Sequence, residues 1–125
     1  VKVYLMKYQV VISDQAKEDL SSIYSYILNN LKSKINADAV FKRLYEAMQD
    51  LNFMPYRYHL YPKEPWLSRG IRFFSVGNYS IFYAVDEDTL TVTIIHVVCG
   101  GIQYEIPASE GGIDGLLNSG KIERR

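Results

Sequence analysis

The side chains best suited to chemistry lie in the second half of the chain, beside segments that are otherwise apolar. Arg69 and Arg72 precede and open one such segment, and either guanidinium could hold a phosphate or a partner's carboxylate through two parallel hydrogen bonds. A histidine side chain titrates near neutral pH, so His96 is the natural candidate for a general acid or base. These three residues are the first candidates for a functional site.

Each of these residues also has a structural interpretation. Arginines at the edge of a strand are commonly solvated, and this is the more frequent case for Arg69 and Arg72. Val92, Ile94 and His96 are spaced two residues apart, so His96 is predicted to lie on their face of a strand as a hydrogen-bonded core histidine. A catalytic or binding role therefore competes with a structural one at every candidate.

Aromatic residues gather in a segment that has no helical or strand periodicity. Tyr56, Tyr58, Tyr61 and Trp66 carry rigid, amphipathic rings, which could anchor a protein partner or stack on bases. The alternative is that they cover the open end of the core. The candidates for partner binding are Arg69, Arg72, Tyr58, Tyr61 and Trp66.

The composition excludes several classes of protein. A chain of 125 residues with 48% apolar and 22% charged residues is the size and make-up of one globular domain. Cys99 is the only cysteine, so no intrachain disulfide can form, and a zinc site would depend on His59, His96 and carboxylates. We expect no metal and no cofactor, and the common phosphate-loop, hydrolase and dinucleotide motifs are absent. The balance of 14 basic and 14 acidic residues weakens an interpretation as a nucleic-acid-binding protein.

The chain gives no sign of a membrane segment. No apolar run approaches the roughly 20 residues that cross a bilayer, and the first residues are too short and too mixed for a signal peptide, so we expect a cytoplasmic protein. Residues 1–104 are predicted to form one domain. Residues 105–125 are predicted to be a weakly ordered tail, because they are rich in glycine and poor in apolar residues. Leu116 and Leu117 are a candidate for a short docking element in this tail.

Hydrophobic periodicity predicts the element order β-α-α-β-β-β. The predicted elements are strands over residues 7–12, 71–76, 79–85 and 90–98 and helices over residues 14–30 and 36–51. Ser13 or Asp14 is predicted to cap the first helix and Asn36 the second, while Gly77 and Asn78 suit a two-residue hairpin turn. The expected fold class is α+β, a two-layer sandwich in which a helical hairpin packs on an antiparallel sheet.

Two segments of the sequence resemble a known family. Residues 12–27 resemble the first helix of the RelE/ParE superfamily of bacterial toxins, in particular its ParE-like, plasmid-stabilisation branch. Residues 70–83 resemble the second and third strands of that branch, with an arginine at Arg72, a tight turn and a Tyr-x-Ile-Phe-Tyr strand that begins at Tyr79. The resemblance covers about residues 8–104, and the fold that it implies is the one predicted above.

The resemblance implies the toxin half of a two-component toxin–antitoxin module, in which the antitoxin wraps and neutralises the toxin. Some members cut messenger RNA in the ribosomal A site, whereas ParE-like members block DNA gyrase. RNA-cleaving members place an arginine just after the tyrosine that opens the third strand, and further basic residues after the last strand. Here Ser80 stands at the first position, and Cys99, Gly101 and Ile102 occupy the second region. Loss of these cations removes the main electrostatic contribution to RNA cleavage.

The favoured hypothesis is therefore a ParE-like toxin that arrests growth by binding DNA gyrase, with an antitoxin as its physiological partner. The alternative is a ribosome-dependent mRNA endoribonuclease that uses Arg72 as phosphate ligand, His96 as proton-transfer group and Tyr104 as orienting hydroxyl. A third hypothesis is a non-toxic partner-binding relative. This hypothesis is considered because Cys99, Gly101 and Ile102 stand where the ParE-like branch commonly has a histidine and two arginines.

Overall fold

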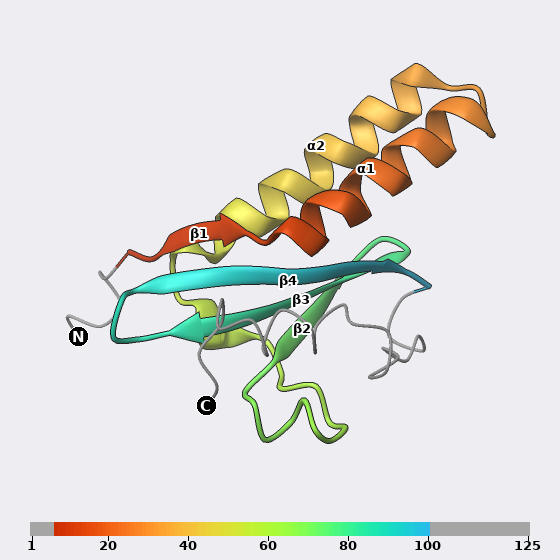
Figure 1. Ribbon diagram of the computed structural model, residues 1–125. Coiled ribbons are helices and arrows are strands. Elements are labelled where there is room, and N and C mark those ends of the chain that lie inside the picture. Colours follow the sequence, from red (N-terminus) through yellow and green to blue (C-terminus); the bar gives the residue numbers. More distant parts are fainter. Residues whose placement is uncertain (1–6, 101–125) are drawn as a thin grey trace.

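The structure is a computed structural model that describes residues 7–100. Its elements follow the predicted order, with two short 3-10 turns after the second helix (Figure 1). The elements are β1 (Gln9–Ile12), α1 (Asp14–Asn29), α2 (Lys34–Gln49), η2 (Asp50–Asn52), η3 (Pro55–Arg57), β2 (Arg72–Val76), β3 (Tyr79–Asp86) and β4 (Thr91–Cys99). The tail predicted over residues 105–125 and the candidate Tyr104 lie outside the described residues.

The two helices pack on a four-stranded sheet, which confirms the predicted α+β sandwich. The strand order in the sheet is β1-β4-β3-β2. Strands β2, β3 and β4 form the predicted antiparallel meander, whereas β1 pairs with β4 in parallel. The expectation of an antiparallel sheet thus holds for β2, β3 and β4. It is corrected for β1, whose parallel pairing makes the sheet mixed.

The helical hairpin explains the direction of β1. Helices α1 and α2 run in opposite directions, so the chain returns to the end of the sheet at which β1 starts (Figure 1). There the Tyr8 amide donates to the Asn52 carbonyl at 2.7 Å, and Lys7 pairs with Phe53. Strand β2 therefore leaves this end in the direction of β1, and two antiparallel reversals give β4 the same direction.

Serine hydroxyls begin both helices. The Ser13 hydroxyl accepts from the Ala16 amide at 3.1 Å, as predicted for the first cap. The second helix begins earlier than predicted, because the Ser33 hydroxyl caps it by accepting from the Asn36 amide at 3.2 Å. Asn36, the predicted cap, is therefore a residue of the first turn.

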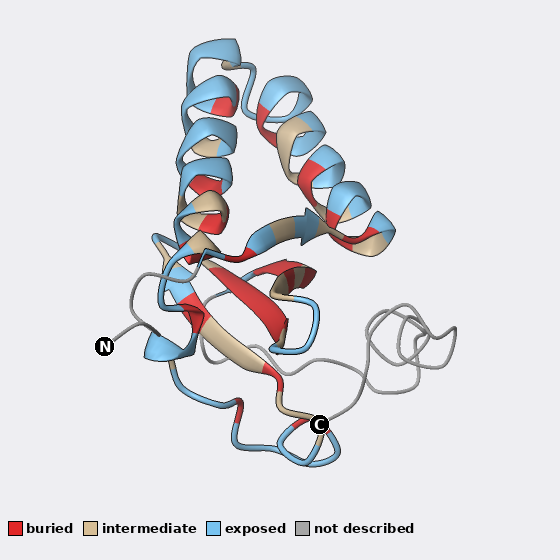
Figure 2. Ribbon diagram, turned by 90° about the vertical axis from the view of Figure 1, so that its left-hand side faces the viewer, coloured by how far each residue is buried: buried red, intermediate tan, exposed pale blue. Residues whose placement is uncertain are grey.

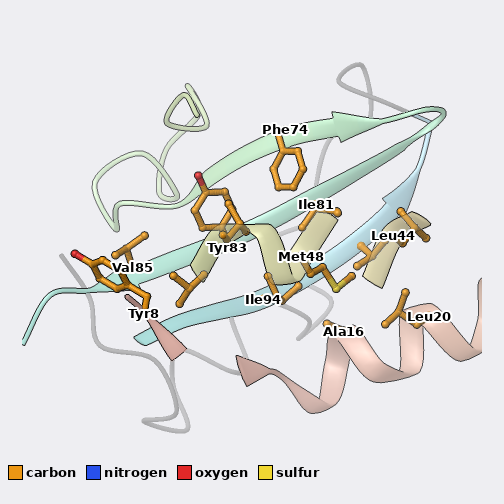
Figure 3. Close-up of a cluster of buried hydrophobic side chains, with 13 residues drawn as sticks. Tyr8, Ala16, Leu20, Leu44, Met48, Phe74, Ile81, Tyr83, Val85 and Ile94 are labelled. Carbon is orange, nitrogen blue, oxygen red and sulfur yellow. The ribbon is translucent and has the colours of Figure 1, made fainter. Parts of the chain in front are cut away.

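The main core lies between the helical hairpin and one face of the sheet. Its side chains come from α1, α2 and alternate positions of the strands, as Figure 3 shows for residues such as Leu20, Leu44, Met48, Tyr83 and Ile94. Figure 2 shows that the buried positions of the helices face inward and that their outward sides are exposed. Each fully buried aliphatic side chain stabilises the fold by about 1.5–3 kcal/mol.

A second, smaller core covers the opposite face of the sheet. Phe82 and Ala84 alternate with Ile81, Tyr83 and Val85 on β3, so the two sets point to opposite faces. The residues that complete the second cluster are Tyr61, Trp66, Ile71, Ile95 and Val98. The connecting segment between α2 and β2 therefore covers this face. Within residues 7–100, neither helix is long and apolar enough to span a membrane.

Candidate functional site

Residues at the start of α1 make hydrogen bonds with the part of β4 that does not pair with β1. The pairing of β1 with β4 ends at Ile12 and Ile94. Beyond this point the Ser13 amide donates to the Ile94 carbonyl at 3.0 Å, and the Ser13 hydroxyl donates to the Ile95 carbonyl at 3.1 Å. The chain turns into the helix while it still bonds to the strand, so the start of α1 is fixed on the sheet.

Asp19 continues this edge and holds the candidate His96. Its carboxylate accepts from the Val97 amide at 2.9 Å, from Gln15 Nε2 at 3.0 Å and from His96 Nδ1. The His96 and Asp19 side chains are only 14% and 13% exposed. His96 is thus a hydrogen-bonded, half-buried residue that ties β4 to α1. Asp19 was not a candidate from the sequence, because its place three residues after Ala16 shows that it lies beside the apolar stripe but not that it meets β4.

A β-bulge changes the face on which His96 was expected. Tyr83 pairs with Ile94, but its neighbour Phe82 pairs with His96, so Ile95 has no counterpart on β3. The prediction that His96 shares the face of Ile94 is therefore wrong, because one extra residue in β4 reverses the alternation. Tyr83 keeps the regular alternation of β3, and its side chain is fully buried in the main core.

Arg72 secures the connecting segment to β2. Its Nη1 donates to the Tyr58 carbonyl at 2.7 Å and reaches the Tyr56 carbonyl at 3.4 Å. The guanidinium carbon lies 5.0 Å from the centre of the Tyr56 ring, a cation–π distance. The Nη1 atom of this half-buried arginine is therefore engaged by backbone carbonyls of the protein itself.

The other candidates for partner binding divide between interior and surface. Tyr61 and Trp66 are 4% and 2% exposed and belong to the second core, which was the structural alternative for this cluster. Tyr58 is half-buried and stacks on Phe74 with 4.2 Å between ring centres. Arg69 is half-buried and lies 5.3 Å from the centre of the Trp66 ring. Only Arg69, Arg72 and Tyr58 among the five candidates reach solvent, and each does so in part.

The sheet does not bring Arg72 and His96 to one point. Arg72 pairs with Tyr83, whose side chain faces the helices, whereas His96 pairs with Phe82, which faces the second core. Directly paired residues share a face, so the register places the two candidates on opposite faces. Strands β2 and β4 are also separated by β3, which corresponds to about 9–10 Å.

Two apolar grooves flank the helical hairpin. The first, which we call the hairpin–sheet groove, has a volume of about 660 Å³ and lies between the hairpin, the β2–β3 turn and the end of β4. Its lining includes Ile23, Tyr26, Ile27, Val40, Arg43, Gly77, Asn78, Tyr79 and Cys99. The second, which we call the outer hairpin groove, has a volume of about 560 Å³. Its lining includes Leu20, Tyr24, Asp38, Phe41 and Tyr45.

Tyr79 in the hairpin–sheet groove and Asp38 in the outer hairpin groove have shifted pKa values. Burial raises the pKa of Tyr79, nearby Cys99 acts in the same direction and Arg43 opposes it. In the outer hairpin groove, hydrogen bonds from Lys34 Nζ at 2.8 Å and the Tyr24 hydroxyl at 2.6 Å lower the pKa of Asp38. No group of three histidine, cysteine or acidic side chains within residues 7–100 could hold a metal ion.

Comparison with known protein families decides between the classes that this fold allows. The sequence model described as "ParE toxin of type II toxin-antitoxin system, parDE" matches residues 10–104. The chain belongs to this ParE toxin family. The resemblance noted in residues 12–27 and 70–83 is thereby confirmed, and the protein is a ParE-family toxin of a type II toxin–antitoxin system.

Solved structures of related toxins share the fold. A chromosomal ParDE toxin–antitoxin system from P. aeruginosa has a TM-score of 0.62 and 17% identity, and the match covers 76% of this chain and 98% of that chain. The RelBE2 toxin–antitoxin complex from Mycobacterium tuberculosis has a TM-score of 0.54 and 22% identity, covering 76% and 93%. A mutant of the E. coli toxin RelE in the free state has a TM-score of 0.54 and 13% identity, covering 94% and 100%. No curated protein matches the chain.

Proposed function

We propose that this ParE-family toxin arrests growth by binding a target protein, DNA gyrase, and that it does not cut messenger RNA. One observation carries the proposal: the two described groups that would do nuclease chemistry are engaged by the protein itself. His96 is bound to Asp19 of α1, and Arg72 is bound to backbone carbonyls of the connecting segment. The strand register also assigns the two residues to opposite faces of the sheet.

The surroundings of the strands support the same proposal. RNA cleavage requires cations that hold the scissile phosphate and stabilise the charge that develops on it. Ser80, which stands where RNA-cleaving relatives of the RelE type have an arginine, is 0% exposed and therefore cannot contact a substrate. The formal net charge of the chain is zero, which gives no general attraction to a polyanion such as the ribosome.

We also propose an antitoxin as the partner that neutralises the protein. The similar structures from P. aeruginosa and M. tuberculosis are described as a toxin–antitoxin system and a toxin–antitoxin complex. In this chain the outer hairpin groove exposes aromatic side chains, with Phe41 41% and Tyr45 43% exposed. Exposed aromatic residues that cluster beside a groove are typical of the centre of a protein interface. The antitoxin is expected to cover this groove.

The target is tested by expressing the chain alone and following growth, plasmid supercoiling and protein synthesis in the same culture. Growth arrest with early loss of negative supercoiling, and inhibition of purified gyrase by the purified chain, would support the proposal. Intact supercoiling with early cleavage of messages on ribosomes would instead establish the nuclease alternative. Normal growth at full expression would favour the non-toxic relative.

The antitoxin surface is tested by co-expression with the product of the neighbouring gene. That product is expected to restore growth in cells that express the toxin. Phe41→Glu should abolish the rescue, because it places a charge in the apolar groove. Ala39→Glu is the matched control, since Ala39 is exposed on the same helix and is not part of the groove lining. Equal rescue of both variants would contradict the proposed surface.

A further inference from the structure

The segment that connects η2 to β2 exposes large apolar side chains. Tyr61 and Trp66 of this segment are buried in the second core, but several of its other apolar side chains are not. The side chains that are 37–42% exposed are Phe53, Met54, Tyr56, Leu60 and Leu67. None of these five residues lines either of the two grooves beside the hairpin. The segment therefore presents apolar surface of its own to solvent.

Two arginines are fixed against tyrosine rings in this segment. The guanidinium carbon of Arg72 lies 5.0 Å from the centre of the Tyr56 ring, and that of Arg57 lies 4.9 Å from the centre of the Tyr58 ring. Arg57 Nη1 donates to the Met54 carbonyl at 3.1 Å, and Arg72 Nη1 donates to the Tyr58 carbonyl at 2.7 Å. The two positive charges are thus held in place before any partner binds, which lowers the entropic cost of binding.

Other contacts place these residues close together. Leu60 pairs with Arg72 in an antiparallel bridge, and directly paired residues share a face. Burial raises the pKa of Tyr83, and the charges of Arg72 and Arg57 oppose this shift, because both guanidinium groups lie near the same hydroxyl. We call this surface the arginine–tyrosine face, and its residues are Met54, Tyr56, Arg57, Leu60 and Arg72.

Met54 has a backbone conformation that does not favour methionine. Its φ of 51° and ψ of 56° lie in the left-handed region, which glycine and asparagine adopt more readily. Leu90 has a similar φ of 53°, but its side chain packs against the main core, whereas that of Met54 is 42% exposed. The fold alone therefore gives methionine no advantage at this position. Methionine is an adaptable apolar side chain that is enriched at protein interfaces, which would account for it.

The charge of the segment indicates an acidic partner. Residues 53–72 contain four basic residues and one acidic residue, Glu64, although the formal net charge of the whole chain is zero. Arginine, tyrosine and methionine are enriched at protein–protein interfaces, whereas interfaces with nucleic acids are more polar and much more positively charged. Exposed methionine and leucine side chains beside two fixed arginines therefore favour a protein segment that carries carboxylates and apolar side chains.

We infer that the arginine–tyrosine face is the surface with which the toxin binds its target protein, and that the target presents an acidic segment with apolar side chains to it. The inference rests on the proposal that the toxin acts by binding a target protein. Carboxylates of the target lie beside Arg57 and Arg72, and its apolar side chains contact Met54, Tyr56 and Leu60. The target and the antitoxin then use different surfaces, since none of these residues lines the outer hairpin groove.

Met54→Asn tests the apolar contact in a binding assay with purified gyrase in the absence of DNA. We expect this variant to bind about tenfold more weakly. Asparagine suits the φ of Met54, so the urea concentration at which the protein unfolds should not decrease. Lys32→Asn is the matched control, because Lys32 is exposed and has a positive φ of 54°. It lies in the turn between α1 and α2, at the far end of the hairpin from the connecting segment (Figure 1), and the control should bind like the original protein.

A pair of substitutions at Leu60 tests the charge of the partner. Leu60→Glu and Leu60→Lys lose the same apolar side chain and gain a charged one at the same exposed position, so they differ mainly in sign. Leu60→Lys is expected to bind gyrase about tenfold more tightly than Leu60→Glu, and this difference should decrease with added salt. Equal binding of the two variants, or tighter binding of Leu60→Glu, would contradict an acidic partner.

Growth arrest and neutralisation by the product of the neighbouring gene are measured for the same variants at equal levels of folded protein. Weaker arrest by Met54→Asn and Leu60→Glu, with unchanged neutralisation, would support the inference, even if the original protein does not bind gyrase and the target is another protein. Loss of neutralisation would overturn it, because the face would then belong to the antitoxin. The same order of affinities for plasmid DNA alone would overturn it in favour of a nucleic acid.

Failure of the inference and failure of the proposed function give different results. If the original protein and all variants inhibit gyrase and arrest growth equally, the proposed function stands and the arginine–tyrosine face is refuted. If the original protein neither binds gyrase nor arrests growth, the proposed function is refuted, and the assignment of this face to a target is refuted with it.

Discussion

Breaking the contact between Asp19 and His96 separates a structural role of the histidine from a catalytic one. We predict that His96→Ala lowers the free energy of unfolding and leaves growth arrest intact in cells where the variant remains folded. Asp19 accepts hydrogen bonds from Gln15, His96 and the buried Val97 amide, and it connects α1 to the edge of β4. Asp19 and His96 are 77 positions apart in the sequence, so their contact stabilises the tertiary structure.

The expected magnitudes follow from the partners that each variant loses. His96→Ala removes one hydrogen bond to an ionised group, which contributes about 1.5–3 kcal/mol. Asp19→Ala also leaves the buried Val97 amide without its acceptor, which costs about 1–3 kcal/mol more. We expect the double variant to be less destabilised than the sum of the single variants by about 1–2 kcal/mol, because both single variants break the same contact.

Urea unfolding of the four proteins of the cycle, followed by circular dichroism, gives this coupling energy. Asp19→Asn is the matched control, since its amide oxygen can still accept from the Val97 amide while the charge is lost. Growth arrest is measured for the same variants at equal levels of folded protein. A coupling energy below about 0.5 kcal/mol would refute the structural role. A folded His96→Ala protein that no longer arrests growth would show that the histidine takes part in toxicity itself.

Two further predictions concern hydroxyl groups in β3. Tyr83→Phe should lower the free energy of unfolding by about 1–3 kcal/mol at pH 7, because the Pro55 carbonyl loses the hydroxyl that donates to it at 2.7 Å. Tyr45→Phe on the exposed helix face is the control and should leave the free energy of unfolding unchanged. Burial raises the pKa of Tyr83, so above about pH 10 the unfolded tyrosine loses its proton before the folded one. The original protein then loses about 1.4 kcal/mol per pH unit from this group, and urea unfolding from pH 7 to 11 should show the gap to the phenylalanine variant closing. Ser80→Ala should leave stability unchanged or raise it, because the buried Ser80 hydroxyl has no hydrogen-bond partner among residues 7–100, and a measured loss above about 1 kcal/mol would contradict this.

Local patterns predicted the elements of the fold well. The helical stripes of α1 and α2 and the Gly77–Asn78 turn each depend on residues close in sequence, and the structure confirms them. The parallel pairing of β1 depends on where the helical hairpin returns the chain, which periodicity does not encode. The direction could nevertheless have been inferred, because two antiparallel helices and two reversals leave β4 parallel to β1.

The candidate residues were harder to interpret, because their roles depend on contacts between distant elements. The face of His96 was mispredicted because a single bulged residue, Ile95, reverses the alternation along β4. Asp19 was missed because nothing in α1 alone shows that its carboxylate meets an unpaired strand edge. Trp66 is buried because the connecting segment folds back over the sheet, and that path has no sequence period.

The described polar groups near the strands mostly join one element to another. Asp19 joins α1 to β4, and Arg72 joins β2 to the connecting segment. Arg57 donates to the carbonyls of Phe53 and Met54 at 2.7 and 3.1 Å, where the chain leaves the second helix. Charges that hold backbone carbonyls and amides cannot move to a substrate without loosening the fold. Within residues 7–100, the apolar grooves beside the helical hairpin are the main surfaces open to another molecule, which supports the proposal that the toxin works by occupying its target.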